Sequence, residues 1–111
     1  MRVLPKINID IAGQNYDLYV ASTNEEQKRG LSYVDHLSHN EGMIFPYDDD
    51  RPRTFQFRDT LIPLKVYFIS RDGEIVQTSF SKPGQQSTIT CNIPTRWVVE
   101  VLDGGDSYDL G

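Results

Sequence analysis

The sequence predicts a mostly β fold, a small antiparallel β-barrel or barrel-like sandwich of six to eight strands with one short helix. Three observations lead to this prediction. Apolar residues alternate with polar ones in several short runs, as they do in half-buried strands. Turn residues separate these runs, most clearly at Asp72-Gly73. A single segment, residues 22–30, carries the start and stop signals of a helix.

Size and composition indicate one globular domain over residues 1–111, with 38% hydrophobic residues. The net charge of -5 disfavours non-specific binding to nucleic acid or to anionic membranes. The single cysteine, Cys91, forms no intramolecular disulfide and fits a reducing compartment. We see no signal peptide and no apolar run long enough to cross a membrane, so we expect a soluble, cytoplasmic protein.

The first two strands are predicted to form a hairpin. Isoleucines alternate from Ile7 to Ile11, and large apolar residues alternate from Tyr16 to Val20. Ala12-Gly13-Gln14-Asn15 lies between the two runs and has the composition of a hairpin turn.

The predicted helix follows this hairpin. Thr23 and Glu26 have the spacing of a capping box, in which each side chain accepts a hydrogen bond from a free amide of the first turn. Because the capping box explains the acidic residue at this position, we do not interpret Glu25-Glu26 as an acidic functional site. Gly30 is suited to end the helix. Apolar residues then recur at helical spacing and are expected to attach the segment to the core, at Leu31, Val34 and Leu37.

Two polar segments contain residue types that bind metals. The first holds Asp35, His36, His39 and Glu41, but zinc sites usually add a second histidine or cysteine pair, and the chain has no other histidine. The second, residues 46–53, carries three successive carboxylates without the alternation of a calcium loop. We interpret both as surface loops, the second with its charge balanced locally by Arg51 and Arg53, and predict no metal site and no cofactor.

The longest apolar run, residues 54–69, is divided by the charged triplet Arg58-Asp59-Thr60. Before the triplet, phenylalanines alternate with polar residues; after it, large apolar residues are nearly continuous. Pro63 excludes one uninterrupted central strand because it cannot donate a hydrogen bond. We therefore predict two strands joined by a sharp corner, and expect a functional site at this corner.

The remainder of the chain is predicted to hold a hairpin around Asp72-Gly73, a loop at 81–88, a short strand at 89–93 and a final strand at 95–102, followed by an acidic, turn-rich tail. Pooling the alternating runs gives an expected core of Phe55, Phe57, Leu64, Val66, Phe68, Ile75, Trp97, Val99 and Val101.

The order of these signals resembles domain-of-unknown-function family 192, over roughly residues 16–105. The resemblance implies a compact, mostly β fold and no established activity. The matching landmarks, in chain order, are Ala21-Ser22-Thr23, Glu25-Glu26-Gln27, Gly30-Leu31, Gly42-Met43-Ile44-Phe45, Thr60-Leu61-Ile62-Pro63-Leu64, Asp72-Gly73, Pro94 and Val99-Glu100-Val101.

The chain departs from the family pattern around the corner. Where the family has Lys-Asn-Thr, this chain has Arg58-Asp59-Thr60; a tryptophan is replaced by Gln56, and an aspartate by Lys65. An Asp59–Lys65 pair would restore neutrality. The chain also ends earlier than the family pattern. It therefore resembles a shortened member of the family, of the kind that a viral genome or an accessory gene would encode.

Two classes of function are left open. No Ser-His-Asp set, phosphate loop or paired-cysteine motif is present, so we predict no catalytic residues. The first hypothesis is a non-catalytic binding or structural module, such as a subunit of a larger assembly, which includes a viral one. Such a module would bind a protein partner or a second copy of itself, and it would bind neither nucleic acid nor a membrane. The alternative is a small-ligand-binding or hydrolytic domain that uses Arg58, Asp59 and Thr60 together with Gln56 and Lys65. The same residues also have a purely structural explanation, because an aspartate and a threonine at a turn commonly form hydrogen bonds to their own backbone.

Overall fold

The computed structural model describes residues 3–104, which form one six-stranded sheet and one short helix. The elements are β1 (Lys6–Ile11), β2 (Gln14–Val20), α1 (Asn24–Arg29), β3 (Glu41–Phe55), β4 (Leu64–Ile69), β5 (Ile75–Ser81) and β6 (Ile89–Leu102). The sheet order is β1-β2-β3-β6-β4-β5, and the sheet does not close, since β1 and β5 are its edges. The predicted mostly β fold with one short helix is therefore confirmed, as a barrel-like, open arrangement.

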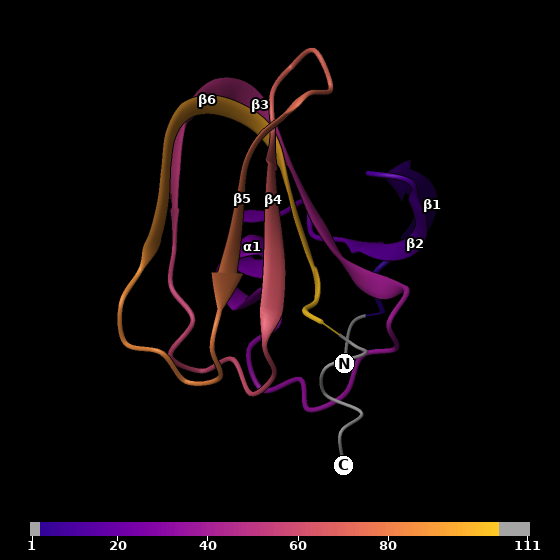
Figure 1. The fold of residues 1–111 in the computed structure, drawn as a ribbon, viewed down its shortest axis with the longest axis vertical. Helices are drawn as coiled ribbons and strands as arrows, with labels where there is room; N and C mark the ends of the chain where they lie inside the picture. Colours follow the sequence, from indigo (N-terminus) through magenta and orange to yellow (C-terminus); the bar gives the residue numbers. More distant parts are fainter. Residues whose placement is uncertain (1–2, 105–111) are drawn as a thin grey trace.

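One strand pairing differs from the prediction. β2 and β3 are parallel, whereas the other four pairings are antiparallel. A parallel pair needs a crossover connection, and α1 with the segment after it provides one. In Figure 1 the β1–β2 hairpin lies to one side of the other strands, and α1 lies behind β4 and β5.

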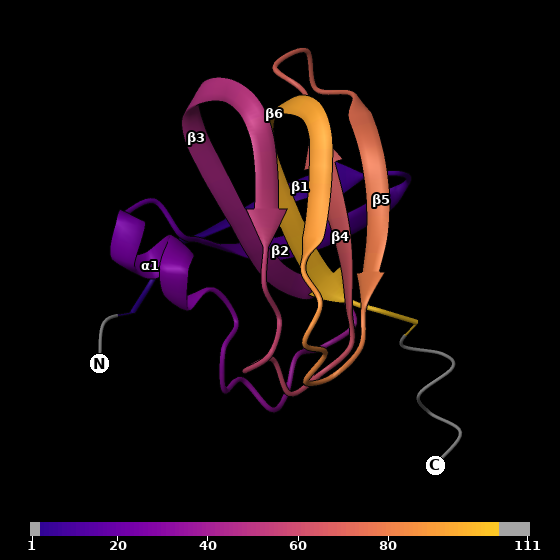
Figure 2. The ribbon, with the colours of Figure 1, turned by 90° about the vertical axis from the view of Figure 1, so that its left-hand side faces the viewer.

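Two long strands bend over together and give the sheet its curvature (Figure 2). β3 and β6 pair antiparallel, with shifts of register between Pro46 and Arg51 and again between Arg51 and Arg53. Pro52 and Pro94 both fall in these irregular stretches, where a missing N–H donor does not interrupt the ladder.

The bend overturns two predictions. Residues 46–53 are part of β3 and not a loop, and residues 89–93 and 95–102 are one strand and not two. The three successive aspartates indicated a loop, because the sequence does not show that this stretch pairs with β6, which is distant along the chain. Arg51 and Arg53 do balance this charge locally, since both form ion pairs with Asp49.

The local predictions for the N-terminal half are confirmed. β1 and β2 form a hairpin around Ala12 and Gly13. The Glu26 amide donates to the Thr23 hydroxyl at 3.1 Å, and the Thr23 amide donates to the Glu26 carboxylate at 3.1 Å. Gly30 follows the last turn with a φ of 52°, and its amide donates to the Glu26 carbonyl at 2.9 Å.

Apolar clusters cover both faces of the central strands. One contains Phe45, Phe57, Leu64, Val66, Phe68 and Val98, and the other contains Tyr16, Leu18, Tyr67, Val99 and Val101. Of the predicted core, Phe55 and Trp97 are only partly buried. Ile75 is 41% exposed, so its prediction was wrong. It begins the edge strand β5, which no further strand covers.

The Asp72-Gly73 turn connects β4 and β5 as predicted, with the Ser70 amide donating to the Glu74 carbonyl at 2.8 Å. Within residues 3–104 no helix has the length and apolar character needed to cross a membrane. The predicted acidic tail beyond Gly104 lies outside the described residues.

Candidate functional site

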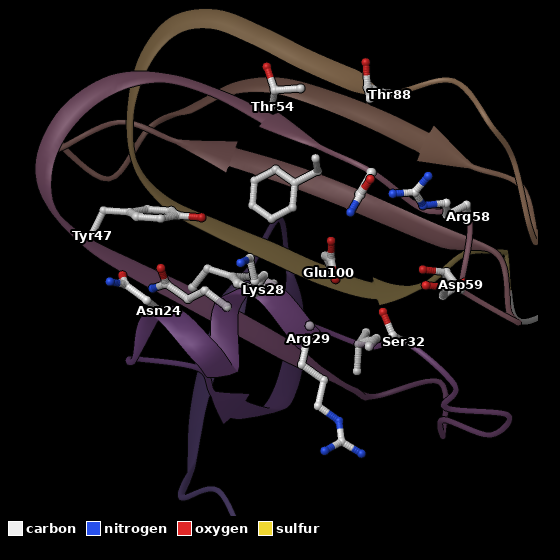
Figure 3. Close-up of a pocket in the computed structure, with 17 residues that line it drawn as sticks. Asn24, Lys28, Arg29, Ser32, Tyr47, Thr54, Arg58, Asp59, Thr88 and Glu100 are labelled. Atoms are coloured by element: carbon white, nitrogen blue, oxygen red, sulfur yellow. The ribbon is translucent and has the colours of Figure 1, made fainter.

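A hollow of about 450 Å³ lies between α1, β3, β6 and the corner at residues 56–60 (Figure 3). We call it the Glu100 pocket. The residues that line it include Lys28, Arg29, Ser32, Phe45, Tyr47, Phe55, Gln56, Arg58, Asp59, Thr60, Thr88 and Glu100.

Glu100 lies in the middle of this pocket (Figure 3) and is only 3% exposed. Among the residues that the structure describes, none forms a hydrogen bond or an ion pair with its carboxyl group. Burial raises the pKa of Glu100 from 4.5 to about 8. The carboxyl is thus largely protonated at neutral pH and offers both a hydrogen-bond donor and an acceptor to the pocket.

The strand pairing, together with the apolar cluster on one face of β6, explains how an acidic residue comes to be buried. β6 lies between β3 and β4, so Glu100 is opposite Met43 on one side and Val66 on the other. Alternation along β6 places Glu100 on the same face as Val98, which belongs to the apolar cluster beneath the pocket. The polar group therefore stands at the edge of the core.

Aromatic residues form one wall of the pocket. The rings of Phe45 and Phe55 pack edge to face with centroids 5.2 Å apart. The ring of Tyr47 carries the guanidinium of Arg53 at 3.7 Å from its centroid, and Arg53 is held by the Thr95 carbonyl at 3.0 Å. Burial is the main cause that raises the pKa of Tyr47 to about 12, with the nearby Glu100 adding to it and Arg53 opposing it.

The predicted corner contributes the opposite wall. Its shape is fixed by backbone groups: the Thr60 amide donates to the Phe57 carbonyl at 3.0 Å, and the Asp59 carbonyl accepts from the Tyr33 amide at 2.9 Å. Arg58 and Asp59 are exposed, and neither side chain has a hydrogen bond or ion pair with any described residue. The structural explanation, in which the Asp59 side chain bonds the backbone, therefore does not hold among the described residues.

Four of the five predicted site residues line one pocket: Gln56, Arg58, Asp59 and Thr60. Lys65 does not. Its neighbours Leu64 and Val66 face the cluster beneath the pocket, so alternation along β4 turns Lys65 to the other face of the sheet. There its ammonium group lies 5.3 Å from the centre of the Tyr67 ring. Within residues 3–104, the expected ion pair with Asp59 does not form.

The candidate metal ligands do not converge. Among residues 3–104, no three His, Cys, Asp or Glu side chains are grouped so that they could hold a metal ion. Glu41 instead accepts from the Ser38 amide at 3.0 Å and pairs with Lys6 at 3.6 Å. The bond from Ser38 is the main cause that lowers the pKa of Glu41.

Sequence reasoning missed Glu100 as a site residue. One signal was available: Glu100 is the only polar residue in the run Trp97-Val98-Val99-Glu100-Val101-Leu102. In a strand with one solvated face such a residue points outward, so the alternation suggested exposure. Only the tertiary structure shows that apolar clusters cover both faces of β6.

The comparisons with known proteins identify relatives without a defined activity. The model of the DUF192 family, described as "Uncharacterized ACR", matches residues 7–106. A structure of a "putative transcription regulator" from Sinorhizobium meliloti 1021 has a TM-score of 0.82 at 24% identity, over 97% of this chain and 88% of that chain. A structure of a protein of unknown function from Novosphingobium aromaticivorans DSM 12444 has a TM-score of 0.78 at 27% identity, over 97% and 79%. No curated protein matches.

Proposed function

This chain belongs to the uncharacterised DUF192 family, so we propose its function from its own pocket: it is a non-catalytic module that binds a small ligand in the Glu100 pocket. The observation that supports the proposal is the buried, unpartnered carboxyl of Glu100 among the described residues. Burying a polar group without a hydrogen bond is costly, and such a group is often kept for a ligand.

The dimensions of the pocket agree with this function. Its volume of about 450 Å³ falls within the range of roughly 300–1,000 Å³ that is usual for small-molecule sites. The combination of an aromatic wall with a few polar groups is also usual for such sites. Phe45 and Phe55 supply the apolar wall, while Glu100, Gln56 and Thr60 supply the polar groups.

The same lining favours binding over catalysis. Nucleophilic catalysis needs a nucleophile next to a base, and general acid–base catalysis usually adds a second group that orients the first. Among the described residues that line the pocket there is no histidine and no cysteine, and Asp59 is exposed at the rim. We propose no catalytic residue and no cofactor.

Protein-observed NMR with a fragment set tests the proposal. The set contains carboxylic acids, amines and neutral amides of about ten heavy atoms. We expect chemical-shift changes at residues 28–32, 54–60 and 100. The variant Gln56→Trp should abolish them by filling the pocket, whereas Gln86→Trp, at another exposed glutamine that lies outside it, should not. Shifts that lie elsewhere, or that survive in Gln56→Trp, would contradict small-ligand binding here.

A second candidate function is that of a structural subunit, with a protein partner or self-association, in a larger assembly such as a virion. Exposed apolar residues support it: Phe80 on the edge strand β5 is 56% exposed, and Ile93 is 47% exposed. A second hollow of about 380 Å³ is lined largely by isoleucines and Trp97. Light scattering on the purified chain should then show an oligomer that Phe80→Glu dissociates. A monomer at all concentrations would contradict self-association.

We further propose that the protein acts in the cytoplasm, because its one cysteine, Cys91, is free and fits a reducing compartment. We also propose that it contacts neither membranes nor nucleic acid, because its net charge of -5 disfavours both. One solved relative is named a "putative transcription regulator". In the described part of this chain the one helix has six residues and is not basic enough to serve as a recognition helix. A mobility-shift assay with random duplex DNA at low salt should show no complex, and a salt-sensitive complex would overturn this proposal.

A further inference from the structure

The chemistry of the pocket narrows the class of ligand, on the premise that the proposed function holds. We propose that the Glu100 pocket binds an organic cation, whose ammonium, amidinium or guanidinium group forms an ion pair with the Glu100 carboxylate. The apolar part of the ligand would pack against Phe45 and Phe55.

The first argument is the cost of leaving Glu100 unpartnered. A hydrogen bond from a cationic nitrogen to a carboxylate is roughly twice as strong as one between neutral groups. Because Glu100 is 3% exposed, such a pair would lie where water screens charge only weakly. A cation is therefore the ligand group that gains most from this carboxyl.

The second argument is the aromatic wall. Rings attract cations through the negative face of their π system, and three aromatic residues, Phe45, Tyr47 and Phe55, line the pocket. Tyr47 already shows this interaction with Arg53, whose guanidinium lies 3.7 Å from the ring centre. The net charge of -5 also raises the local concentration of cations around the protein.

The cations at the rim oppose the proposal, but weakly. Lys28 and Arg58 are exposed, so solvent and salt screen their repulsion of a bound cation. Figure 3 shows the Arg29 side chain directed away from Glu100, and Asp59 at the rim adds a second carboxylate. The buried carboxyl therefore outweighs the exposed charges.

Proton linkage gives this proposal a distinctive signature. The other titratable groups that line the pocket are Lys28 and Arg29 on α1, Tyr47 on β3, and Arg58 and Asp59 at the corner, with the Arg29 side chain directed away from Glu100. None of these side chains is of a type that ordinarily titrates between pH 6 and 8. Since burial raises the pKa of Glu100 to about 8, binding a cation at neutral pH must release the Glu100 proton. The affinity for a cation should then rise about tenfold from pH 6 to pH 7.

Three probes of one shape and different charge test the inference: benzamidinium, benzamide and benzoate. Titration calorimetry at pH 7 should show benzamidinium binding at least about tenfold more tightly than benzamide, with release of close to one proton. The release is measured by repeating the titration in two buffers of different ionisation enthalpy. Benzoate should not bind.

Matched variants assign the effect to one carboxyl. Glu100→Gln keeps the side-chain shape and should remove both the preference for benzamidinium and its pH dependence. Glu74→Gln, at the exposed β4–β5 turn outside the pocket, should leave both the preference and the pH dependence intact. Thermal unfolding of each variant verifies that it is folded.

The outcomes separate the inference from the proposed function. If fragments bind in the pocket but benzamidinium does not, or if benzoate binds more tightly, the cationic class is wrong and the small-ligand site stands. If benzamidinium binds equally well to Glu100→Gln, Glu100 is not its partner and the inference is overturned. If no fragment of any class binds in the part of the pocket that the Gln56→Trp side chain would fill, the proposed function fails and the inference fails with it.

Discussion

A Cβ atom on Gly42 would lie 2.2 Å from the backbone carbonyl oxygen of Glu100. Gly42 is paired with Val101, so β3 and β6 approach each other closely beside the acidic residue of the pocket. No real side chain fits at that distance, and the contact is with backbone, which cannot rotate away. Gly42 thus allows β6 to hold Glu100 where it is.

Gly42→Ala should destabilise the protein by about 1–3 kcal/mol or more, because the two strands must separate to admit a methyl group. Urea unfolding measures this change. Gly73→Ala is the control: at φ 83° with open space around it, it should cost about 1 kcal/mol of backbone strain alone. Equal losses at the two positions would mean that β3 tolerates the methyl group at Gly42.

The stability of the protein should depend on pH through Glu100. Burial raises the pKa of Glu100 from 4.5 to about 8, so between these values the folded state keeps a proton that the unfolded chain releases. The free energy of unfolding from this group should therefore fall as the pH rises through that window, by on the order of 4 kcal/mol. Urea unfolding from pH 5 to pH 9 measures it.

Glu100→Gln is the matched variant for that prediction. It should lack the decline and be more stable than the natural chain at pH 8, because an amide stays neutral. Parallel pH profiles for the two proteins would show that Glu100 keeps an ordinary pKa and is better solvated than its burial indicates.

Phe68→Ala should lower the free energy of unfolding by about 3–5 kcal/mol, as other large aromatic truncations in cores do. Phe68 is completely buried and packs edge to face on Phe55 at 6.1 Å. Phe80→Ala on the edge strand is the control, since that ring is 56% exposed, and it should cost less than about 1 kcal/mol. A small loss at Phe68 would contradict the packing of β4.

Thr23→Ala should reduce stability by about 1 kcal/mol, because the Glu26 amide loses its hydrogen bond to the Thr23 hydroxyl. Thermal unfolding measures the change. Thr23→Ser retains the hydroxyl and should recover most of the loss. If neither substitution moves the melting temperature, the cap contributes nothing to the fold.

Arg58→Gln and Asp59→Asn should each change stability by less than about 0.5 kcal/mol, because both side chains are exposed. Neither bonds to another described residue, and backbone hydrogen bonds hold the corner. Chemical denaturation provides the test. A loss of 1 kcal/mol or more at Asp59 would restore the structural explanation of its carboxylate.

The sequence by itself determined the elements that depend on neighbours along the chain. The Ala12-Gly13 and Asp72-Gly73 turns and the Thr23–Glu26 capping box are interactions over a few residues, so their residue types and spacing suffice. The corner at residues 58–60 belongs to this group, because Pro63 and the charged triplet interrupt an apolar run. So does the candidate site in part, since this corner is one wall of the pocket.

Only the tertiary structure decided which faces are covered. β3 continues through three aspartates because β6 pairs with it. Arginines also neutralise the aspartates, and one of them, Arg96, is distant in sequence and donates to Asp50 at 2.8 Å. Lys65 turns away from the pocket because its neighbours Leu64 and Val66 face the cluster beneath the pocket, and a nearly continuous apolar run does not show which face of β4 that is. Glu100 is buried because apolar clusters cover both faces of β6, and the residue pattern of one strand cannot report whether its second face meets water or a second core. The burial of one carboxyl, on which the proposed ligand depends, is therefore a property of the sheet and not of the strand.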